Sequence, residues 1–373
     1  MRKLALAFLM CFIFVGGAFA ADDVIKIGFY NCLTGQNAFG GQLELEGVQL
    51  AHKQFPEILG KKIEVIVVDN KSDKVEAANA VTRLIESDNV NVIIGTYASG
   101  LAIAGGEVAE VSGVPMLATS ATNPLVTQGK KYIFRTCFID PLQGAGAAAY
   151  AYRDLGYKKA AILTDVVSDY AVGLAKFFKD NFLALGGEVV SEMRYQTGDT
   201  DFTAQLTEIM SKEPDVVFLP AYFAEGAIIL KQAKELGAAF RFMGGDAMDN
   251  PDMVTLGGDA IEGFIYTGFA YAPDMPEMND VAKKFTDDWY KEYGKDPNGN
   301  AALGYDAYLL VLDAIRRAGS AEPEKIRDAM ETTKDLPTVT GTTTLDADHN
   351  PQKDIGILEI KDGKKVFVGT VVP

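Results

Sequence analysis

The sequence predicts an α/β protein of two Rossmann-like lobes, each with a mostly parallel sheet, joined by a three-strand hinge. Runs rich in Val and Ile alternate with segments that have amphipathic helical spacing along the whole chain. Buried strands separated by helices are typical of parallel sheets that helices cover on both faces. The arrangement also occurs twice, since strand, Tyr-bearing loop, helix, strand and polar loop follow one another over 90–124 and again over 215–251.

The first 20 residues are predicted to be a signal peptide and not part of the fold. Arg2 and Lys3 precede a short apolar run over 4–15, and the A-x-A sequence at 18–20 fits a cleavage site. We therefore expect cleavage near Ala20 and export to the periplasm. An N-terminal anchor is the alternative, but the run is short and wrongly flanked for a membrane span.

The first lobe is assigned residues 21–140 and 269–350. Apolar periodicity predicts one helix around Leu43, Val48 and Leu50 and another that ends near Val111. The other expected elements are strands at 24–30, 63–69, 90–95 and 114–118, and helices at 74–87, 277–293, 300–318 and 323–332.

The second lobe is assigned residues 141–268 and 351–373, and the chain is expected to cross between the lobes near Asp140, Gly268 and Asn350. Two C-terminal strands, 355–360 and 364–371, are joined by a turn that contains Gly363. The other expected elements are strands at 160–165, 187–195, 215–223 and 240–248, and helices at 170–185, 201–212 and 227–236.

The negative charge of the chain disfavours two classes of partner. The net charge is −16, which disfavours nucleic acid and anionic membrane surfaces. The hydrophobic content of 48% supports large cores.

Two cysteines, Cys32 and Cys137, remain after removal of the signal peptide. They can pair in an oxidising compartment, but a chain of this size does not need a disulfide. We therefore expect two free thiols.

Catalytic and metal-binding signals are missing from the sequence. Only His52 and His349 are present, and neither lies beside a serine or cysteine in a nucleophile motif. No His, Cys or carboxylate cluster has metal-ligand spacing, and no phosphate-binding glycine loop opens the first strand–helix unit. We therefore expect a protein that is not an enzyme, without cofactor or metal; the sequence GYDAY at 304–308 is interpreted as helix packing.

Small hydroxyl-bearing loops follow two neighbouring strands. Ser99 follows one strand and precedes a helix, so that it can offer a hydroxyl and an N–H to an anion; an ordinary helix cap is the alternative. Ser120, Ala121 and Thr122 follow the next strand and add hydroxyls, an N–H and an outward carbonyl. Because the carboxyl ends of neighbouring strands meet, these groups predict a carboxylate site held by dipoles without Lys or Arg.

The second lobe supplies an acid and two aromatic side chains. Asp246, just past a strand end, is the natural partner for an ammonium group, although a helix cap is the alternative. Tyr170 and Tyr222 lie at other strand ends of that lobe, where partial core packing is the alternative. Phe39, in a glycine-rich loop, is a candidate wall for the pocket that takes the ligand side chain.

These residues stand in motifs that resemble the leucine/isoleucine/valine-binding proteins, the type I periplasmic receptors of branched-chain amino-acid ABC transporters. The resemblance covers essentially the whole mature chain. It is carried by IGFYNCLTGQNAFGGQ, VDNKSDKVEAANAVTRLI, GTYASG, ATSATNPLVTQGKKYIFRT, DYAVGLAKFF, GDTDFTAQL and ALGYDAYLLVLDAI.

The resemblance implies a role for each candidate residue. Ser99 and the Thr122 N–H would hold the ligand carboxylate, while the Ser120 carbonyl, the Thr122 hydroxyl and Asp246 would hold the ammonium group. Tyr170, Tyr222 and Phe39 would line the pocket, together with Ala121, which lies between Ser120 and Thr122. The chain departs from a member of this family in three respects. That member has a glutamate where Asp246 stands, and its disulfide is absent here because Ser72 and Ala98 align with the two cysteine positions. Phe39 and Tyr97 are expected to reshape the pocket.

The expected function is that of a monomeric periplasmic receptor that binds an aliphatic, branched-chain amino acid between two closing lobes and passes it to the permease of an ABC importer. A receptor for amides, urea or aromatic acids on the same fold is the alternative. A secreted α/β enzyme would need a catalytic pair that the sequence lacks, and a sensory module would share the same binding site.

Overall fold

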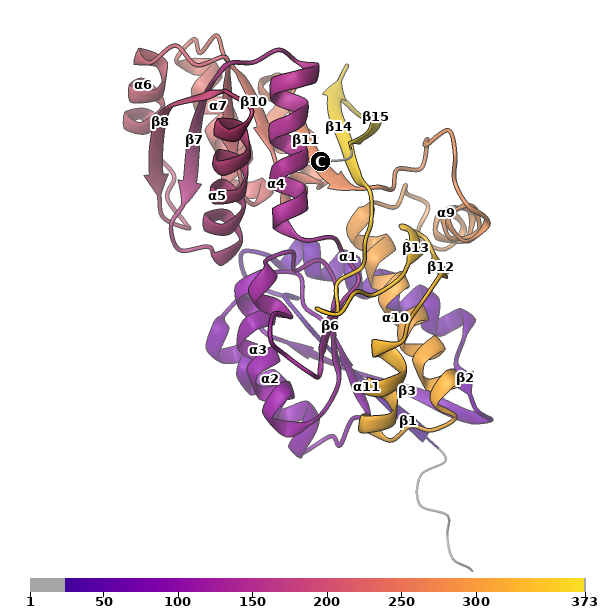
Figure 1. Cartoon of the computed structure of the whole chain (residues 1–373). Coiled ribbons are helices and arrows are strands. Elements are labelled where there is room, and N and C mark those ends of the chain that lie inside the picture. The colour runs from indigo at the N-terminus through magenta and orange to yellow at the C-terminus, as the bar shows by residue number, and fades with distance from the viewer. Residues whose placement is uncertain (1–23, 372–373) are drawn as a thin grey trace, which may run out of the picture.

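The computed structural model describes residues 24–371, so the predicted signal peptide (1–20) and its cleavage site lie outside the described residues. Over that range, none of the helices combines the length and the apolar character that crossing a membrane requires. Two sheets, each with helices packed against it, form two lobes (Figure 1). The predicted fold class is confirmed.

The first sheet has six strands, and all but β2 run parallel. Helices α1, α10 and α11 cover one face and α2 and α3 the other. In spatial order the strands are β2 (Glu57–Ile58), β3 (Lys61–Asp69), β1 (Val24–Asn31), β4 (Val92–Ile94), β5 (Met116–Ala118) and β6 (Ile133–Arg135). The helices of this lobe are α1 (Ala38–Gln54), α2 (Lys74–Glu86), α3 (Ser99–Ser112), α9 (Asp280–Tyr293), α10 (Gly299–Ala318) and α11 (Pro323–Glu331).

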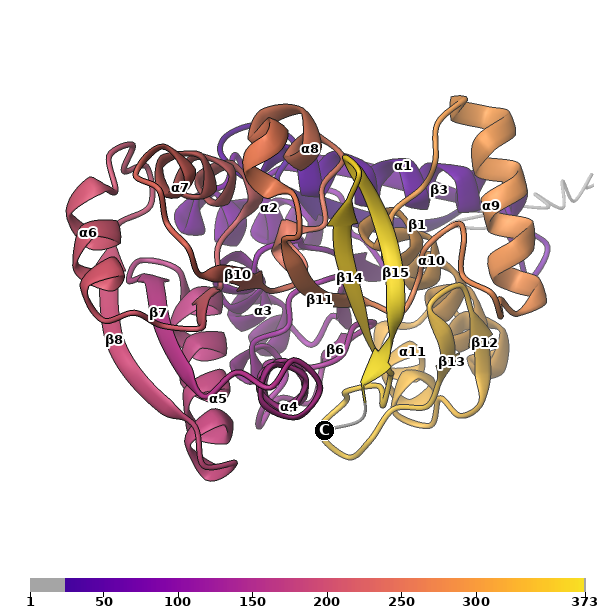
Figure 2. The same ribbon diagram turned by 90° about the horizontal axis from the view of Figure 1, so that it is seen from above.

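The second sheet has seven strands, with a parallel centre extended by the antiparallel hairpin β14–β15 beyond β11 (Figure 2). In spatial order the strands are β15 (Lys364–Val371), β14 (Ile355–Lys361), β11 (Ile265–Phe269), β10 (Arg241–Gly244), β9 (Val216–Leu219), β7 (Lys159–Asp165) and β8 (Glu188–Tyr195). The helices are α4 (Asp140–Ala149), α5 (Asp169–Ala184), α6 (Thr203–Ser211), α7 (Phe223–Glu235) and α8 (Asp252–Gly257).

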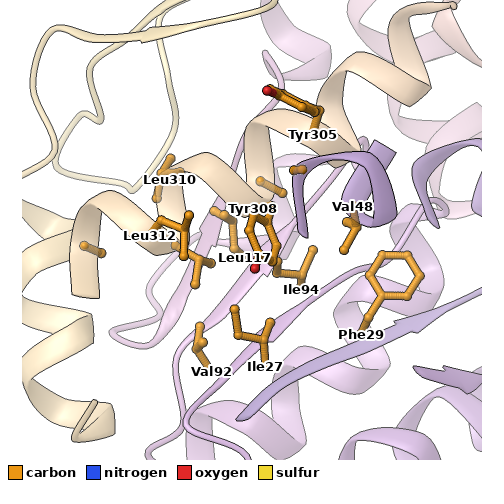
Figure 3. Packing of buried hydrophobic residues seen from close by; sticks show 14 of the residues in the cluster. Ile27, Phe29, Val48, Val92, Ile94, Leu117, Tyr305, Tyr308, Leu310 and Leu312 are labelled. Carbon is orange, nitrogen blue, oxygen red and sulfur yellow. The ribbon is translucent and has the colours of Figure 1, made fainter. Parts of the chain in front are cut away.

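One core of the first lobe lies between its sheet and the pair α1 and α10, and another lies between the opposite face of the sheet and the pair α2 and α3. Ile27, Phe29 and Ile94 point from the strands toward Val48 of α1 and Tyr308 of α10 (Figure 3). These strand residues are fully buried, as the runs of Val and Ile predict. The GYDAY sequence lies inside α10, where it contributes to this packing as expected.

Several features of the fold escaped the sequence prediction. Helix α4 is built from DPLQGAGAAA, in which Gly and Ala give no contrast between an apolar and a polar face, so its periodicity is invisible. The short strands β6 and β11 and the hairpin of β12 (Leu336–Thr338) and β13 (Gly341–Thr343) were also missed. Cys137 lies two residues beyond β6, in the segment that leads to α4.

The chain passes from one sheet to the other three times. It does so between β6 and α4, between β11 and α9, and between β13 and β14. The exact lobe boundaries given above stay predictions. The carboxyl ends of β4 and β5 in the first sheet are directed toward the carboxyl ends of β9 and β10 in the second sheet. The loops that follow these four strands therefore face one another between the lobes.

Candidate ligand-binding site

The two hydroxyl loops of the first lobe are tied to each other. Ser99 is the first residue of α3, and its Oγ accepts a hydrogen bond from the Asn123 N–H at 3.2 Å. The Ser99 hydroxyl hydrogen is therefore left to bind something else. Thr122 is fully buried, and its hydroxyl has no hydrogen-bond partner among the described residues. A buried hydroxyl without a partner is costly, which favours a ligand there.

Ser120 does not present its hydroxyl to the cleft, because that group donates to a Glu44 carboxylate oxygen and, at 3.4 Å, to the Tyr97 carbonyl. Only the Ser120 carbonyl remains for a ligand, which is the role that the family resemblance gives it. Ala121 is fully buried, and its carbonyl accepts a hydrogen bond from Arg135 at 2.7 Å.

Glu44 is a buried acid that sequence reasoning missed. Its carboxylate accepts hydrogen bonds from the Thr119 hydroxyl at 2.5 Å and the Asn31 amide at 2.6 Å, in addition to Ser120. Burial raises the pKa of Glu44 to about 7, and these three donors oppose the rise. Its sequence signal was its place on the inward face of α1, four residues before Val48.

Asp246 lies in the second lobe and points inward. It begins a short 3-10 helix just after β10 and is 3% exposed. One carboxylate oxygen accepts hydrogen bonds from the Gln143 amide at 2.7 Å and the Tyr170 hydroxyl at 3.0 Å. Burial raises the pKa of Asp246 to about 6, although both donors favour the charged form. Gln143 was not predicted, because it belongs to the unrecognised helix α4.

A row of three tyrosines connects the two lobes. The Tyr97 and Tyr222 ring centroids are 5.7 Å apart, and those of Tyr222 and Tyr170 are 5.6 Å apart. The Tyr97 hydroxyl reaches the carbonyl of Ala247 at 3.4 Å. Tyr97 stands two residues before Ser99, so this contact places Asp246 opposite the hydroxyl loops and not on the outer surface.

Phe39 does not belong to this row. Its ring is half-buried and lies 5.8 Å from that of Phe223, which begins α7 of the other lobe. Gly40, the next residue, faces Tyr97 instead: a Cβ there would come within 2.5 Å of the Tyr97 ring. Gly40 therefore leaves room for the Tyr97 ring, which stands in the row of tyrosines.

Asp140 is a second buried acid near the cleft. It is fully buried, and neither of its carboxylate oxygens has a hydrogen-bond partner among residues 24–371. Burial raises the pKa of Asp140 to about 8, and the nearby Asp246 carboxylate adds to the rise. The Thr122 hydroxyl lies near enough to lower this pKa but is not in hydrogen-bonding geometry.

A cavity of about 350 Å³ adjoins the site and has walls from both lobes. Ala98 and Leu101 line it on one side, and Ser168 and Tyr222 on the other. Polar contacts cross between the lobes at its rim: Lys74 pairs with Asp169 at 2.6 Å. Two further contacts cross the rim. The Asn123 side-chain amide donates to the Asp169 carbonyl at 2.8 Å, and the Gln36 side-chain amide donates to the Glu225 carboxylate.

The cysteines and histidines have structural surroundings. Cys32 and Cys137 are both free and buried, as expected, and burial raises the pKa of each thiol to about 12. A thiol in that state is a poor nucleophile. His52 Nδ1 lies 2.8 Å from the Tyr308 hydroxyl, and His349 Nδ1 lies 2.9 Å from the Ile133 carbonyl, so both rings serve packing.

The three buried acids predict how stability depends on pH. Burial raises the pKa of Glu44, Asp140 and Asp246 above the ordinary range of carboxyl groups, so these three groups bind more protons in the folded chain than in the unfolded chain between pH 5 and pH 8. Their contribution to stability is complete below the unfolded pKa and is lost as the pH rises through the folded pKa. We expect the melting temperature of the ligand-free protein to fall from pH 5 to pH 8.5.

Thermal melts across this range check the expectation. D140N should flatten the upper part of the curve, whereas D280N, at an exposed carboxylate, should leave its shape unchanged. A melting temperature that rises steadily to pH 8.5 would contradict the assignment of these acids.

Comparison with known proteins places the chain in a family. Residues 24–365 match the family model described as periplasmic binding protein. A relative from Pseudomonas aeruginosa, the leucine-, isoleucine-, valine-, threonine- and alanine-binding protein, is 31% identical over 315 residues, which is 83% of each chain.

Two solved structures show the same fold. A leucine-binding protein from Thermotoga maritima is 41% identical, with a TM-score of 0.91 over 94% of this chain and 99% of that chain. A solute-binding protein of an ABC transporter from R. palustris, solved in complex with benzoate, is 27% identical, with a TM-score of 0.85 over 94% of this chain and 97% of that chain.

Proposed function

Because this chain belongs to the periplasmic binding protein family, we propose that it is an extracytoplasmic receptor of an ABC importer and binds an aliphatic amino acid of the leucine, isoleucine and valine class. In this proposal residues 1–20 are removed on export to the periplasm. The mature chain acts as a monomer, and its closed form docks on a membrane permease.

The observation that carries the proposal is the opposite chemistry of the two facing loops. Ser99 and Thr122 present neutral donors in the first lobe, whereas Asp246 presents a buried carboxylate in the second. A dipolar solute with a carboxylate at one end and an ammonium group at the other satisfies both sides at once.

Each candidate residue then has a role. The hydroxyl and N–H of Ser99 and the N–H of Thr122 bind the ligand carboxylate. The Ser120 carbonyl, the Thr122 hydroxyl and Asp246 bind the ammonium group. The walls are formed by Tyr97, Tyr170, Tyr222, Ala121 and, at the edge of the site, Phe39.

Affinity depends on the charged ends of the ligand. Burying a leucine-sized side chain contributes about 1.5–3 kcal/mol. Micromolar binding needs about 8 kcal/mol. The polar contacts supply much of the difference and reject ligands that lack either end. Because such a ligand touches both lobes, it binds the closed form better than the open form and shifts the population toward closure.

Isothermal titration with a panel of α-amino acids tests the proposed function. We expect heat with leucine, isoleucine or valine at micromolar dissociation constants or below. Weak or no heat is expected with lysine and glutamate, whose charged side chains would be buried against tyrosine rings. Absence of heat with every α-amino acid would contradict the proposal.

A receptor for aromatic acids, amides or urea is the second candidate. The benzoate complex of the R. palustris protein and the row of three tyrosines favour it. Such ligands carry no ammonium group, so they would give Asp246 no partner. Titration with benzoate therefore separates the two candidates, since the amino-acid receptor should give no heat with it.

A further inference from the structure

A buried guanidinium lies behind the loop that carries Thr122. Arg135, the last residue of β6, is fully buried. Its Nη1 donates to the Ala121 carbonyl at 2.7 Å, and its Nη2 donates to the Asn123 carbonyl at 2.9 Å and the Thr127 hydroxyl at 3.0 Å. A longer contact of 3.4 Å joins Nη2 to the Pro124 carbonyl.

All of these acceptors are neutral. Over residues 24–371 no carboxylate lies within ion-pair distance of the guanidinium, and its Nε has no hydrogen-bond partner. Asp140 and Asp346 act on it only through space. Buried cations are normally paired, because an uncompensated buried charge is costly. The position of Arg135 therefore favours an anion close to this loop.

The geometry of one peptide group connects Arg135 to the site. The Ala121 carbonyl and the Thr122 N–H belong to the same peptide group, and in a trans peptide they point in opposite directions. By holding the carbonyl, Arg135 fixes the Thr122 N–H on the far side of the loop, where no described residue accepts a hydrogen bond from it. The charge also polarises the peptide group and makes this N–H a stronger donor.

We propose that Arg135 is a positioning residue for the ligand carboxylate, which acts through the Ala121–Thr122 peptide group without touching the ligand. This inference rests on the proposed function, because it needs a ligand with a carboxylate. It explains how an anion is held by loops that contain neither Lys nor Arg: the cation is one peptide group behind them.

The test compares L-leucine with L-leucinamide, which keeps the ammonium group and side chain but loses the carboxylate charge. R135Q should weaken leucine binding about 10- to 100-fold, the range expected for hydrogen bonds to a charged group, and leucinamide binding less than about threefold. R135K keeps the charge but not the planar fork, so its preference for leucine should fall between those of the wild type and R135Q.

Arg317 provides a control away from the site; unlike Arg135, its guanidinium pairs with a carboxylate, that of Asp313, at 2.7 Å. Its guanidinium also binds a carbonyl, that of Ala329 at 2.5 Å, and the Thr333 hydroxyl at 2.8 Å, but it joins α10 to α11 away from the site. R317Q should lower the melting temperature and leave the preference for leucine over leucinamide unchanged.

Each outcome decides a different point. Equal weakening of both ligands in R135Q, or no weakening, would overturn the inference and leave Arg135 a structural residue. If R135Q does not fold, R135K decides alone, and an unchanged preference contradicts the inference. If the wild-type protein binds neither leucine nor any other α-amino acid, the proposed function fails and the inference falls with it.

Discussion

Replacing Asp246 with asparagine should weaken the binding of an α-amino acid by about 30-fold to several thousand-fold, the effect of removing one partner of a buried charge pair. Asparagine keeps the shape of the side chain and an oxygen that can accept hydrogen bonds from Gln143 and Tyr170. The variant therefore removes the charge and little else. Titration calorimetry with leucine measures the loss.

Asp249 is the matched control for this variant. It is also buried and close in sequence, but it pairs with Lys365 at 3.1 Å and accepts a hydrogen bond from the Tyr266 hydroxyl at 3.2 Å. D249N should lower stability and leave leucine affinity within about threefold. D246E, which keeps the carboxylate on a side chain one methylene longer, should retain most of the affinity. If D246N bound leucine as well as the wild type, Asp246 would not be the ammonium partner.

Replacing Gly304 with alanine should lower the free energy of unfolding by about 3 kcal/mol or more. A Cβ at Gly304 would lie 2.1 Å from the Glu44 carbonyl oxygen, and a Cβ at Gly47 would lie 2.1 Å from the carbonyl of Ala301. Helices α1 and α10 thus meet backbone to backbone, and no rotamer change can relieve the clash. Chemical denaturation measures the change.

The same substitution should also reach the ligand site, because Glu44 holds the Ser120 hydroxyl. We expect G304A to bind leucine more weakly when it folds. Gly369 is the control, since its φ lies outside the left-handed region and nothing lies within 4 Å of a Cβ added there, so G369A should change stability by less than about 0.5 kcal/mol. Equal stability of G304A and G369A would contradict the close packing.

The sequence predicted the parts of the fold that have strong periodicity. Strands such as β1 and helices such as α2 were found because their apolar residues recur at the spacing of a buried strand or an amphipathic helix. Helix α4 was missed because alanine and glycine leave no polar face, and with it the Gln143 contact to Asp246 was missed.

The candidate site was predicted in outline, and its supporting groups were not. Ser99, Thr122 and Asp246 follow strand ends, where topology alone brings loops together. Glu44 and Arg135 act from behind the loops, at positions that depend on packing between α1, β5 and β6. The sequence around a single charged residue in an apolar run does not predict which loop that residue will contact in the folded chain.

The proposed ligand contacts come from both lobes and involve Phe39, Ser99, Ser120, Thr122, Tyr170, Tyr222 and Asp246. The geometry already separates them: Ser120 can offer only its carbonyl, and Phe39 stands outside the tyrosine row. Tyr97, in contrast, belongs to the tyrosine row, and Gly40 leaves room for its ring.

The most direct test removes one charged end of the ligand at a time. Affinities are measured for leucine, for 3-methylbutylamine, which lacks the carboxylate, and for 4-methylpentanoate, which lacks the ammonium group. If the two lobes grip opposite ends of one solute, leucine should bind and each analogue should bind at least about 100-fold more weakly. Binding of either analogue as tightly as leucine would show that one lobe does not recognise its end of the molecule.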